Sequence, residues 1–291
     1  MYITYMFRQT VAHLRFPFSF FLLPVYLFAL SQVSHIDTGR AILIFCIFHL
    51  LIYPASNGYN SYMDRDTGPI GGLAAPPPVT RQLFRVTLGM DIASVIGSLF
   101  VSWVFAGCCV AYILASRAYS YRGVRLKRYP WLGYLTVVVF QGAVVFYATY
   151  HGSSTDLTLH VPALPMLVSS LLIGGFYPLT QIYQHKADAA DGVRTISSVL
   201  GYRGTFLFCA GVYILGFALM AVYFNGLGEI SKFVRIQAWF FPVFIYFIHW
   251  FTQVTKDTGK ADHSHTMRMN WLAASAANAA FGTLLIWLHS E

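Results

Sequence analysis

Long apolar segments separated by polar loops dominate the chain. A helix needs about 20 apolar residues to cross a bilayer. Such segments lie at 16–34, 40–57, 130–150, 161–183, 204–225, 235–255 and 269–289. One further apolar stretch, 83–116, is too long for one helix, and Gly107 interrupts it. We expect two helices there, with a tight turn near 105–108 and a short second helix. The pattern predicts an all-α polytopic membrane protein: nine transmembrane helices in a bundle around a central cavity, with polar cytoplasmic loops.

The composition agrees with this class. The 291 residues are 57% hydrophobic and only 10% charged, whereas a soluble domain carries roughly 25% charged residues. A charge at the centre of a bilayer is costly, which accounts for the deficit. The four cysteines all lie in apolar segments and form no CxxC pair. We interpret them as buried thiols, with neither a disulfide framework nor a zinc site.

The basic residues predict how the chain is oriented. With nine spans, 16 of the 19 Lys and Arg residues lie on the side of the N-terminus, and the other three are Arg40, Lys232 and Arg235. Positive charge concentrates in cytoplasmic loops, so we expect the N-terminus in the cytoplasm. This topology explains the net charge of +8 better than nucleic-acid binding does. Chain size and the absence of a targeting peptide favour a bacterial inner (plasma) membrane.

The longer polar loops, 58–82, 117–129, 184–203 and 256–268, are all predicted on the cytoplasmic side. We therefore expect the chemistry there. Two acidic helix ends lie four spans apart. They suggest a single domain, 1–291, built from two pseudo-repeated halves, roughly 16–129 and 130–255, with a final helix at 269–289. Asp91 lies in an apolar stretch, and we expect it near the cytoplasmic end of its span, in reach of water.

The first acidic helix end carries Asn57, Asn60 and Asp64, followed by Asp66. Residues three and four apart share one helix face, so the two amides and Asp64 should converge. Carboxylate and amide oxygens suit Mg²⁺, which is often shared with substrate phosphates. The simpler interpretation is an ordinary polar helix end.

The second acidic helix end carries Gln181, Gln184 and Asp188, followed by Asp191 and Arg194. Gln184 and Asp188 are four residues apart and should share a face. A guanidinium in the following loop, from Arg194, can hold phosphate through two parallel hydrogen bonds. The alternative is a capped helix end with a structural arginine.

A third polar segment lies between these two. Five basic residues fall within 117–128, among them Arg125 and Lys127, and Tyr121 is one of the tyrosines interleaved with them. Contact with anionic lipid headgroups explains such a cluster on its own. The tyrosine hydroxyls, however, could also donate to a bound anion.

The three segments together resemble the motifs of the UbiA superfamily of intramembrane prenyltransferases, over nearly the whole chain. Asn60 and Asp64 match the family's first motif, with Arg65 and Asp66 after them. Second-motif matches are Asp188, Gly192, Arg194 and Thr195. The loop Tyr119–Lys127 is similar to the tyrosine and lysine segment that faces pyrophosphate in the family. The chain departs from the family where Gln181, Gln184 and Gly68 replace carboxylates.

The resemblance implies a transferase that moves a prenyl group from prenyl pyrophosphate to a small aromatic or lipid acceptor, with Mg²⁺ as cofactor. Its implied metal ligands are Asn57, Asn60, Asp64, Asp66, Gln184, Asp188 and Asp191. Its implied pyrophosphate ligands are Asn60, Tyr121, Arg125, Lys127 and Arg194. The residues implied as catalytic are Asp64, Asp188, Arg194 and Lys127.

Two alternatives remain at this point. A terpene synthase of the same fold would cyclise the prenyl pyrophosphate without an acceptor. A transporter or scaffold would use the polar loops only to bind membrane lipid. Transporters usually place polar groups at the membrane midplane between broken helices, whereas here they gather at one interface. The acceptor, the prenyl chain length and the oligomeric state are not specified by the sequence.

Overall fold

The computed structural model describes residues 2–288, with side chains from 7 to 287, and these residues form helices and loops without a named strand. Position 289, the end of the predicted last span, lies outside the described residues. The helices of the N-terminal part are α1 (Tyr2–Leu14), η1 (Phe16–Phe21), α2 (Leu23–Leu30), α3 (Thr38–Phe45), η2 (Cys46–Ile52), α4 (Tyr53–Asp64), α5 (Arg81–Leu99), α6 (Trp103–Ser120) and η3 (Leu126–Arg128). The remainder are α7 (Pro130–Val137), η4 (Val138–Val144), α8 (Val145–Ser153), α9 (Ala163–Phe176), η5 (Tyr177–Gln184), α10 (His185–Ala190), α11 (Ile196–Gly226), α12 (Ile230–Lys256), η6 (Thr258–Lys260) and α13 (His263–Leu288).

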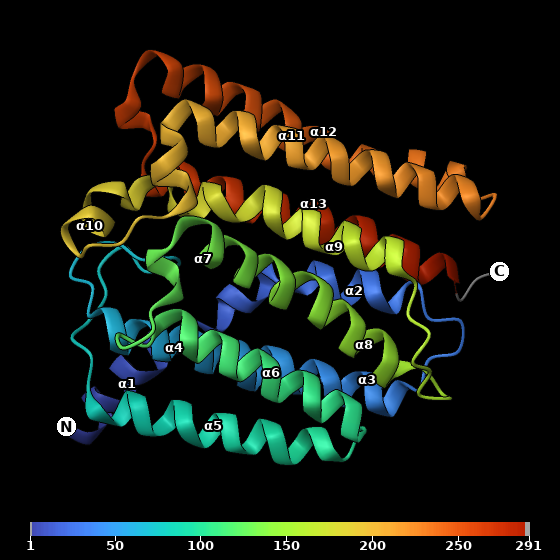
Figure 1. Ribbon diagram of the computed structural model, residues 1–291, viewed down its shortest axis with the longest axis horizontal. Coiled ribbons are helices and arrows are strands. Elements are labelled where there is room, and N and C mark those ends of the chain that lie inside the picture. The colour runs from blue at the N-terminus through green and yellow to red at the C-terminus, as the bar shows by residue number, and fades with distance from the viewer. Residues whose placement is uncertain (1, 289–291) are drawn as a thin grey trace.

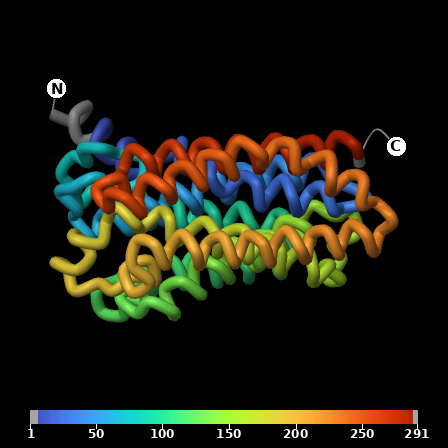
Figure 2. Tube along the Cα trace, turned by 90° about the horizontal axis from the view of Figure 1, so that it is seen from above, coloured from blue at the N-terminus to red at the C-terminus, as the bar shows by residue number. Residues whose placement is uncertain are grey.

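The long helices run along the long axis of the molecule (Figure 1). The polar loops 65–80, 121–129, 191–195 and 257–262 all lie at the end that also holds α1 and α10 (Figures 1 and 2). The connections at the opposite end, such as those between α2 and α3 and between α11 and α12, contain fewer charged residues. The predicted gathering of polar loops on one side is therefore confirmed.

Proline accompanies two of the helix irregularities. The helix Thr38–Asp64 is continuous, but its central part, η2, is a π-helix that ends two residues before Pro54. Proline cannot donate the backbone hydrogen bond that an α-helix requires, and a π-bulge absorbs such a misfit. In the same way, Pro178 lies in the first turn of the 3₁₀ helix η5, which follows α9 directly.

The predicted turn within 83–116 was misplaced. The break falls at Phe100–Ser102, and the second helix, α6, is 18 residues long rather than short. The Ser102 hydroxyl accepts a hydrogen bond from the Phe105 backbone N–H at 2.9 Å and so caps α6. Gly107 lies inside α6 and has open space around it. A capping serine, not the glycine, therefore decides where the chain turns.

The number of nine spans is not confirmed. Seven helical segments of the described chain are long and apolar enough to cross a membrane, and the bent pair Phe7–Phe21 and Leu23–Leu30 makes an eighth. The helix α5 carries Arg81, Arg85 and Asp91 and is not among them.

The interpretation of Asp91 as water-exposed was wrong. The residue is only 8% exposed, and its carboxylate accepts a hydrogen bond from Arg117 Nε at 2.9 Å. The Arg117 guanidinium also lies 4.0 Å from the ring centroid of Tyr59 on α4. This buried ion pair joins α4, α5 and α6 just below the polar loops.

Candidate active site

The first acidic motif is the end of α4. The helix stops at Asp64 because Arg65 takes the left-handed conformation, with φ of 56°. The predicted face forms, since Asn57, Asn60 and Asp64 all lie in this α-helix. Asn60 Nδ2 donates a hydrogen bond to Ser120 Oγ, 2.9 Å away at the end of α6. Asp66 follows the helix; the residue as a whole is exposed, but its carboxyl group lies against the protein.

Basic side chains of the 121–129 loop cover Asp64. Lys127 Nζ forms an ion pair with the Asp64 carboxylate, and the two side chains are 11% and 5% exposed. Arg122 reaches the same helix end and donates from Nε to the Met63 carbonyl at 2.8 Å. These contacts bring the third segment onto the first.

Arg125 joins the two acidic motifs. Its guanidinium nitrogen lies 3.6 Å from Asp64 Oδ1, and it donates hydrogen bonds to the carboxylate and backbone carbonyl of Asp191. Partial burial of Asp191 opposes ionisation, but the hydrogen bond and positive charge of Arg125 outweigh it and lower the pKa of Asp191. The loop that carries Arg125 is thus held between the ends of α4 and α10.

The second motif has a different local shape from the one predicted. Gln181 and Gln184 lie in the 3₁₀ helix η5, and Asp188 lies in the short helix α10. The two glutamines are three residues apart and share a face of a 3₁₀ helix. Gln184 ends η5 and Asp188 belongs to α10, so these two residues do not share one α-helical face as expected. Asp188 is half-buried, and Arg194 is exposed in the loop before α11.

A hydrogen-bonded chain lies beneath the second motif and was not predicted from the sequence. Gln181 Nε2 donates to the Tyr177 hydroxyl at 2.7 Å, and the hydroxyls of Tyr177 and Tyr119 are hydrogen-bonded. Tyr119 comes from the end of α6, so this chain is a second link between the two motif regions. Tyr177 had no sequence signal beyond its place at the end of an apolar run.

Arg15 also lies at this site, although its place in the sequence indicated only a charge that orients the chain in the membrane. It donates to the carbonyls of Gly71 at 3.0 Å and Asn57 at 3.2 Å. These bonds hold the loop after the first motif against α4. The charge of Arg15 is also near Asp64 and Asp66.

The oxygen atoms present here fit a magnesium ion. Asp64 Oδ1 and Gln181 Oε1 are buried without a hydrogen-bond partner among the described residues. Desolvation of its carboxyl and the negative charge of Asp64 raise the pKa of Asp66, so a cation beside these carboxylates would be stabilised. Within residues 7–287 no three His, Cys, Asp or Glu side chains gather as a closed metal site. Mg²⁺ commonly takes only one or two carboxylates together with substrate phosphates and water.

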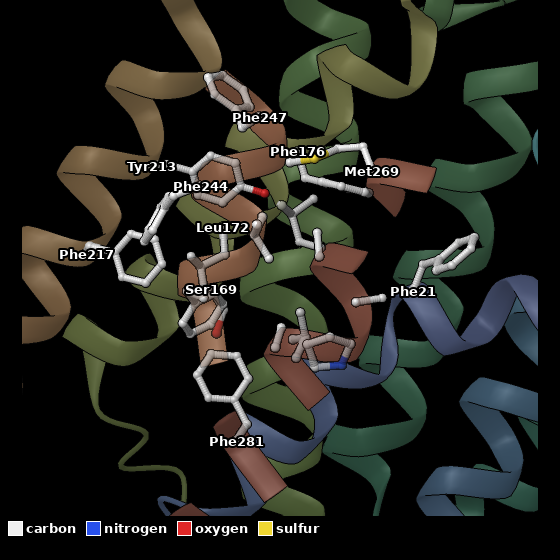
Figure 3. A pocket seen from close by; sticks show the side chains of 18 of the residues that line it. Phe21, Ser169, Leu172, Phe176, Tyr213, Phe217, Phe244, Phe247, Met269 and Phe281 are labelled. Atoms are coloured by element: carbon white, nitrogen blue, oxygen red, sulfur yellow. The ribbon is translucent and has the colours of Figure 1, made fainter. Parts of the chain in front are cut away.

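An apolar cavity of about 460 Å³ lies among α2, α9, α11, α12 and α13 (Figure 3). Phenylalanine, leucine, isoleucine and alanine side chains form most of its walls, and Ser169 and Tyr213 supply hydroxyls. Its lining includes Phe176, whose neighbour Tyr177 begins η5. The element that carries the glutamines of the second motif therefore starts beside the cavity.

Comparison with known proteins decides the family. The model described as the UbiA prenyltransferase family matches residues 19–274.

The chain belongs to the UbiA prenyltransferase family.

Solved structures of UbiA proteins share the fold at low sequence identity. A UbiA homologue from Archaeoglobus fulgidus bound to DMAPP and Mg²⁺ is 16% identical, with a TM-score of 0.71 over 96% of this chain and 99% of that one. The apo UbiA homologue from Aeropyrum pernix K1 is 18% identical, with a TM-score of 0.69 over 94% and 98%. A digeranylgeranylglyceryl phosphate synthase is 15% identical, with a TM-score of 0.62 over 98% and 99%. A search of curated protein sequences finds no match.

The predicted family and all-helical membrane fold are thus confirmed for this UbiA protein. Ion pairs bring together Asp64, Arg125, Lys127 and Asp191. Asn60 lies one helical turn before Asp64 on α4 and is bonded to Ser120 instead. Other predicted residues lie at the same end without such direct links. They are Asn57, Asp66, Tyr121, Gln184, Asp188 and Arg194.

Proposed function

We propose that this chain transfers a prenyl group from a prenyl pyrophosphate to a small aromatic acceptor within the membrane, with Mg²⁺ as cofactor. One observation carries the proposal. A cluster of paired cations and carboxylates, in which Arg125 reaches both acidic motifs, lies at the end of the bundle where η5 leaves an apolar cavity. A prenyl pyrophosphate has this same division into a charged head and an apolar tail.

The head would lie among the residues of the polar end. In this proposal Arg125, Lys127 and Arg194 bind the pyrophosphate, assisted by Asn60 and Tyr121. Arginine and lysine both suit phosphate oxygens, the former through paired hydrogen bonds. Lys127 and Arg125 are paired with carboxylates in this structure. When the substrate binds, phosphate oxygens would replace the carboxylates as partners of these two cations. The carboxylates would then be available as ligands of the metal.

The metal would be held by oxygens from both motifs. The proposed ligands are Asn57, Asn60, Asp64, Asp66, Gln184, Asp188 and Asp191. When bound, Mg²⁺ supplies positive charge that neutralises the oxygens of the departing pyrophosphate.

The protein's own groups contribute to the same step. As the allylic carbon–oxygen bond breaks, negative charge grows on the leaving group. Lys127 and Arg125 would stabilise this charge because ion pairs with carboxylates hold both cations in place in a buried part of the site. Arg194 would add its positive charge from the exposed loop before α11. The allylic cation left behind would lie toward the cavity. Its aromatic walls can stabilise positive charge and keep water away. The acceptor then supplies the electron pair for the new bond.

Product analysis tests this proposal against the terpene synthase alternative. Purified protein would be incubated with Mg²⁺ and prenyl pyrophosphates, with and without a panel of aromatic acceptors, and the organic products identified by mass spectrometry. We expect a prenylated acceptor and no organic product without one. A cyclic hydrocarbon or alcohol formed without any acceptor would contradict the transferase and establish a cyclase.

A further inference from the structure

The apolar cavity extends from the polar end of the bundle to a floor deeper inside it. Its side between α11 and α12 is open to the surface of the molecule, where the lining residues Ile214, Phe244 and Ile248 are 70%, 40% and 61% exposed. We call its polar end the mouth. The direction follows from the helices, because α9 runs toward the polar loops and α13 runs away from them (Figure 1). Phe176 and Met269 therefore lie at the mouth, and Phe281 lies at the far end (Figure 3).

Three phenylalanines close the floor. The Phe281 ring stacks on Phe28, with ring centroids 4.6 Å apart, and meets Phe240 edge-on at 6.4 Å. Phe28 and Phe281 are each 1% exposed and Phe240 is 6% exposed. On its other side Phe28 contacts Phe146 in the core, at 5.6 Å. The cavity thus ends against a packed aromatic layer from α2, α12 and α13, which we call the aromatic floor (Phe28, Phe240 and Phe281).

The helix rise gives the depth of the cavity. Met269 and Phe281 both line it and lie twelve residues apart on α13, a distance of about 18 Å at the α-helical rise. An isoprene unit adds four carbon–carbon bonds of about 1.5 Å, which the zigzag shortens to roughly 5 Å. The depth therefore matches a tail of about three to four isoprene units.

The walls offer such a tail apolar contact along its whole length. Of the two hydroxyls, that of Ser169 is already used by the Pro165 carbonyl at 3.1 Å. Tyr213 points its hydroxyl toward the cavity nearer the mouth (Figure 3). A shorter tail would leave the space above the floor unfilled and lose dispersion contacts. A longer tail would meet the floor, which cannot yield without displacing packed rings, and its excess length would have to leave the cavity through the open side between α11 and α12.

We propose that the aromatic floor sets the donor's chain length, and that this protein prefers prenyl pyrophosphates of three to four isoprene units. The inference rests on the proposed function, in which the prenyl tail occupies this cavity. Specificity then lies in residues that never contact the pyrophosphate.

Binding of a donor series tests the inference independently of turnover. The probes are thiopyrophosphate analogues with tails from one to six isoprene units, measured by calorimetry with Mg²⁺ on the full-length protein in detergent. Wild type should bind best at three or four units. Phe281→Ala should move the optimum at least one unit longer, with about tenfold higher affinity for that longer analogue, since added methylenes gain buried apolar area.

A second variant works in the opposite direction and does not remove a core ring. Ala277 lines the cavity one helical turn before Phe281, so Ala277→Leu should move the optimum at least one unit shorter. The matched control is Phe247→Ala, a cavity phenylalanine on the mouth side of Phe240 on α12. It should leave the position of the optimum unchanged.

The outcomes separate the two proposals. If wild type binds the series but Ala277→Leu keeps the same optimum, the aromatic floor does not set the length, and the proposed function stands. If Phe281→Ala folds and also keeps the wild-type optimum, the conclusion is the same. If wild type binds no analogue of any length, the proposed function itself is contradicted.

Discussion

At the scale of single residues, the polar end is a set of charges that are already paired. Lys127 holds Asp64, and Arg125 lies between Asp64 and Asp191. The spacing of Asn57, Asn60 and Asp64 predicted their shared helix face, because a local period decides it. The contacts of Arg15 with Gly71 and Asn57 span 56 and 42 residues. No local pattern could predict them.

Replacement of Lys127 by alanine tests the role of this residue in pyrophosphate binding. A hydrogen bond to a charged group contributes about 1.5–3 kcal/mol, so kcat/KM for the donor should fall about ten- to a hundredfold. Steady-state kinetics of pyrophosphate release would measure the change.

The matched control is Lys256→Ala. Lys256 is exposed in the last turn of α12, at the same end of the molecule. It removes the same charge and should leave kcat/KM within about twofold of wild type, because exposed charges are largely screened by salt. Equal losses in both variants would mean that overall charge, rather than a specific contact, attracts the donor.

At the scale of elements, apolar length predicted most helices, but hydrogen-bonding residues and prolines decide where they break. Ser102 caps α6, so the turn came at 100–102 and not at Gly107. The 3₁₀ helix η5 begins beside Pro178 and carries the second motif, so a simple α-helical face did not describe Gln184 and Asp188. Asp91 lies in an apolar stretch. Its burial there is explained by its partner Arg117, which is distant in the sequence and neutralises its charge.

One helix crossing depends on a glycine. A Cβ atom added to Gly142 in η4 would lie 2.4 Å from the Ser170 Cα on α9, and small residues permit such close helix contacts in membranes. Gly142→Ala should therefore destabilise the protein by about 1–3 kcal/mol, as overpacking does. Unfolding in detergent, followed by circular dichroism, would measure the loss.

Gly107→Ala is the control for this substitution. Gly107 lies in α6 and has no atom within 4 Å of its added Cβ, and alanine favours helix more than glycine does. Its stability should equal or exceed that of wild type. If both alanine variants unfold alike, close packing at Gly142 does not hold η4 against α9.

At the scale of the whole molecule, the charged loops lie at one end of the bundle, and the apolar cavity begins beside η5, the helix that leads into them. The family and the membrane fold followed from apolar lengths, charge distribution and three motifs, because the bilayer restricts spanning structures to a few solutions. The position of the cavity among α2, α9, α11, α12 and α13 did not follow, since it depends on which large side chains meet across helices. The aromatic floor likewise joins residues from three distant segments.

The most direct test of the account is Mg²⁺-dependent release of pyrophosphate from a prenyl pyrophosphate by wild type, Asp64→Asn and Asp188→Asn. The control is Asp37→Asn, which changes a carboxylate at the opposite end of the molecule (Figure 1). Asp37 caps α3 by accepting from the Arg40 N–H, and asparagine caps equally well. Release should require Mg²⁺ and persist in the control. It should fall at least about a hundredfold in each site variant, because a group that stabilises the charge of the leaving group is lost. Release that continues without a divalent metal, or that both site variants retain, would contradict a reaction carried by the two acidic motifs.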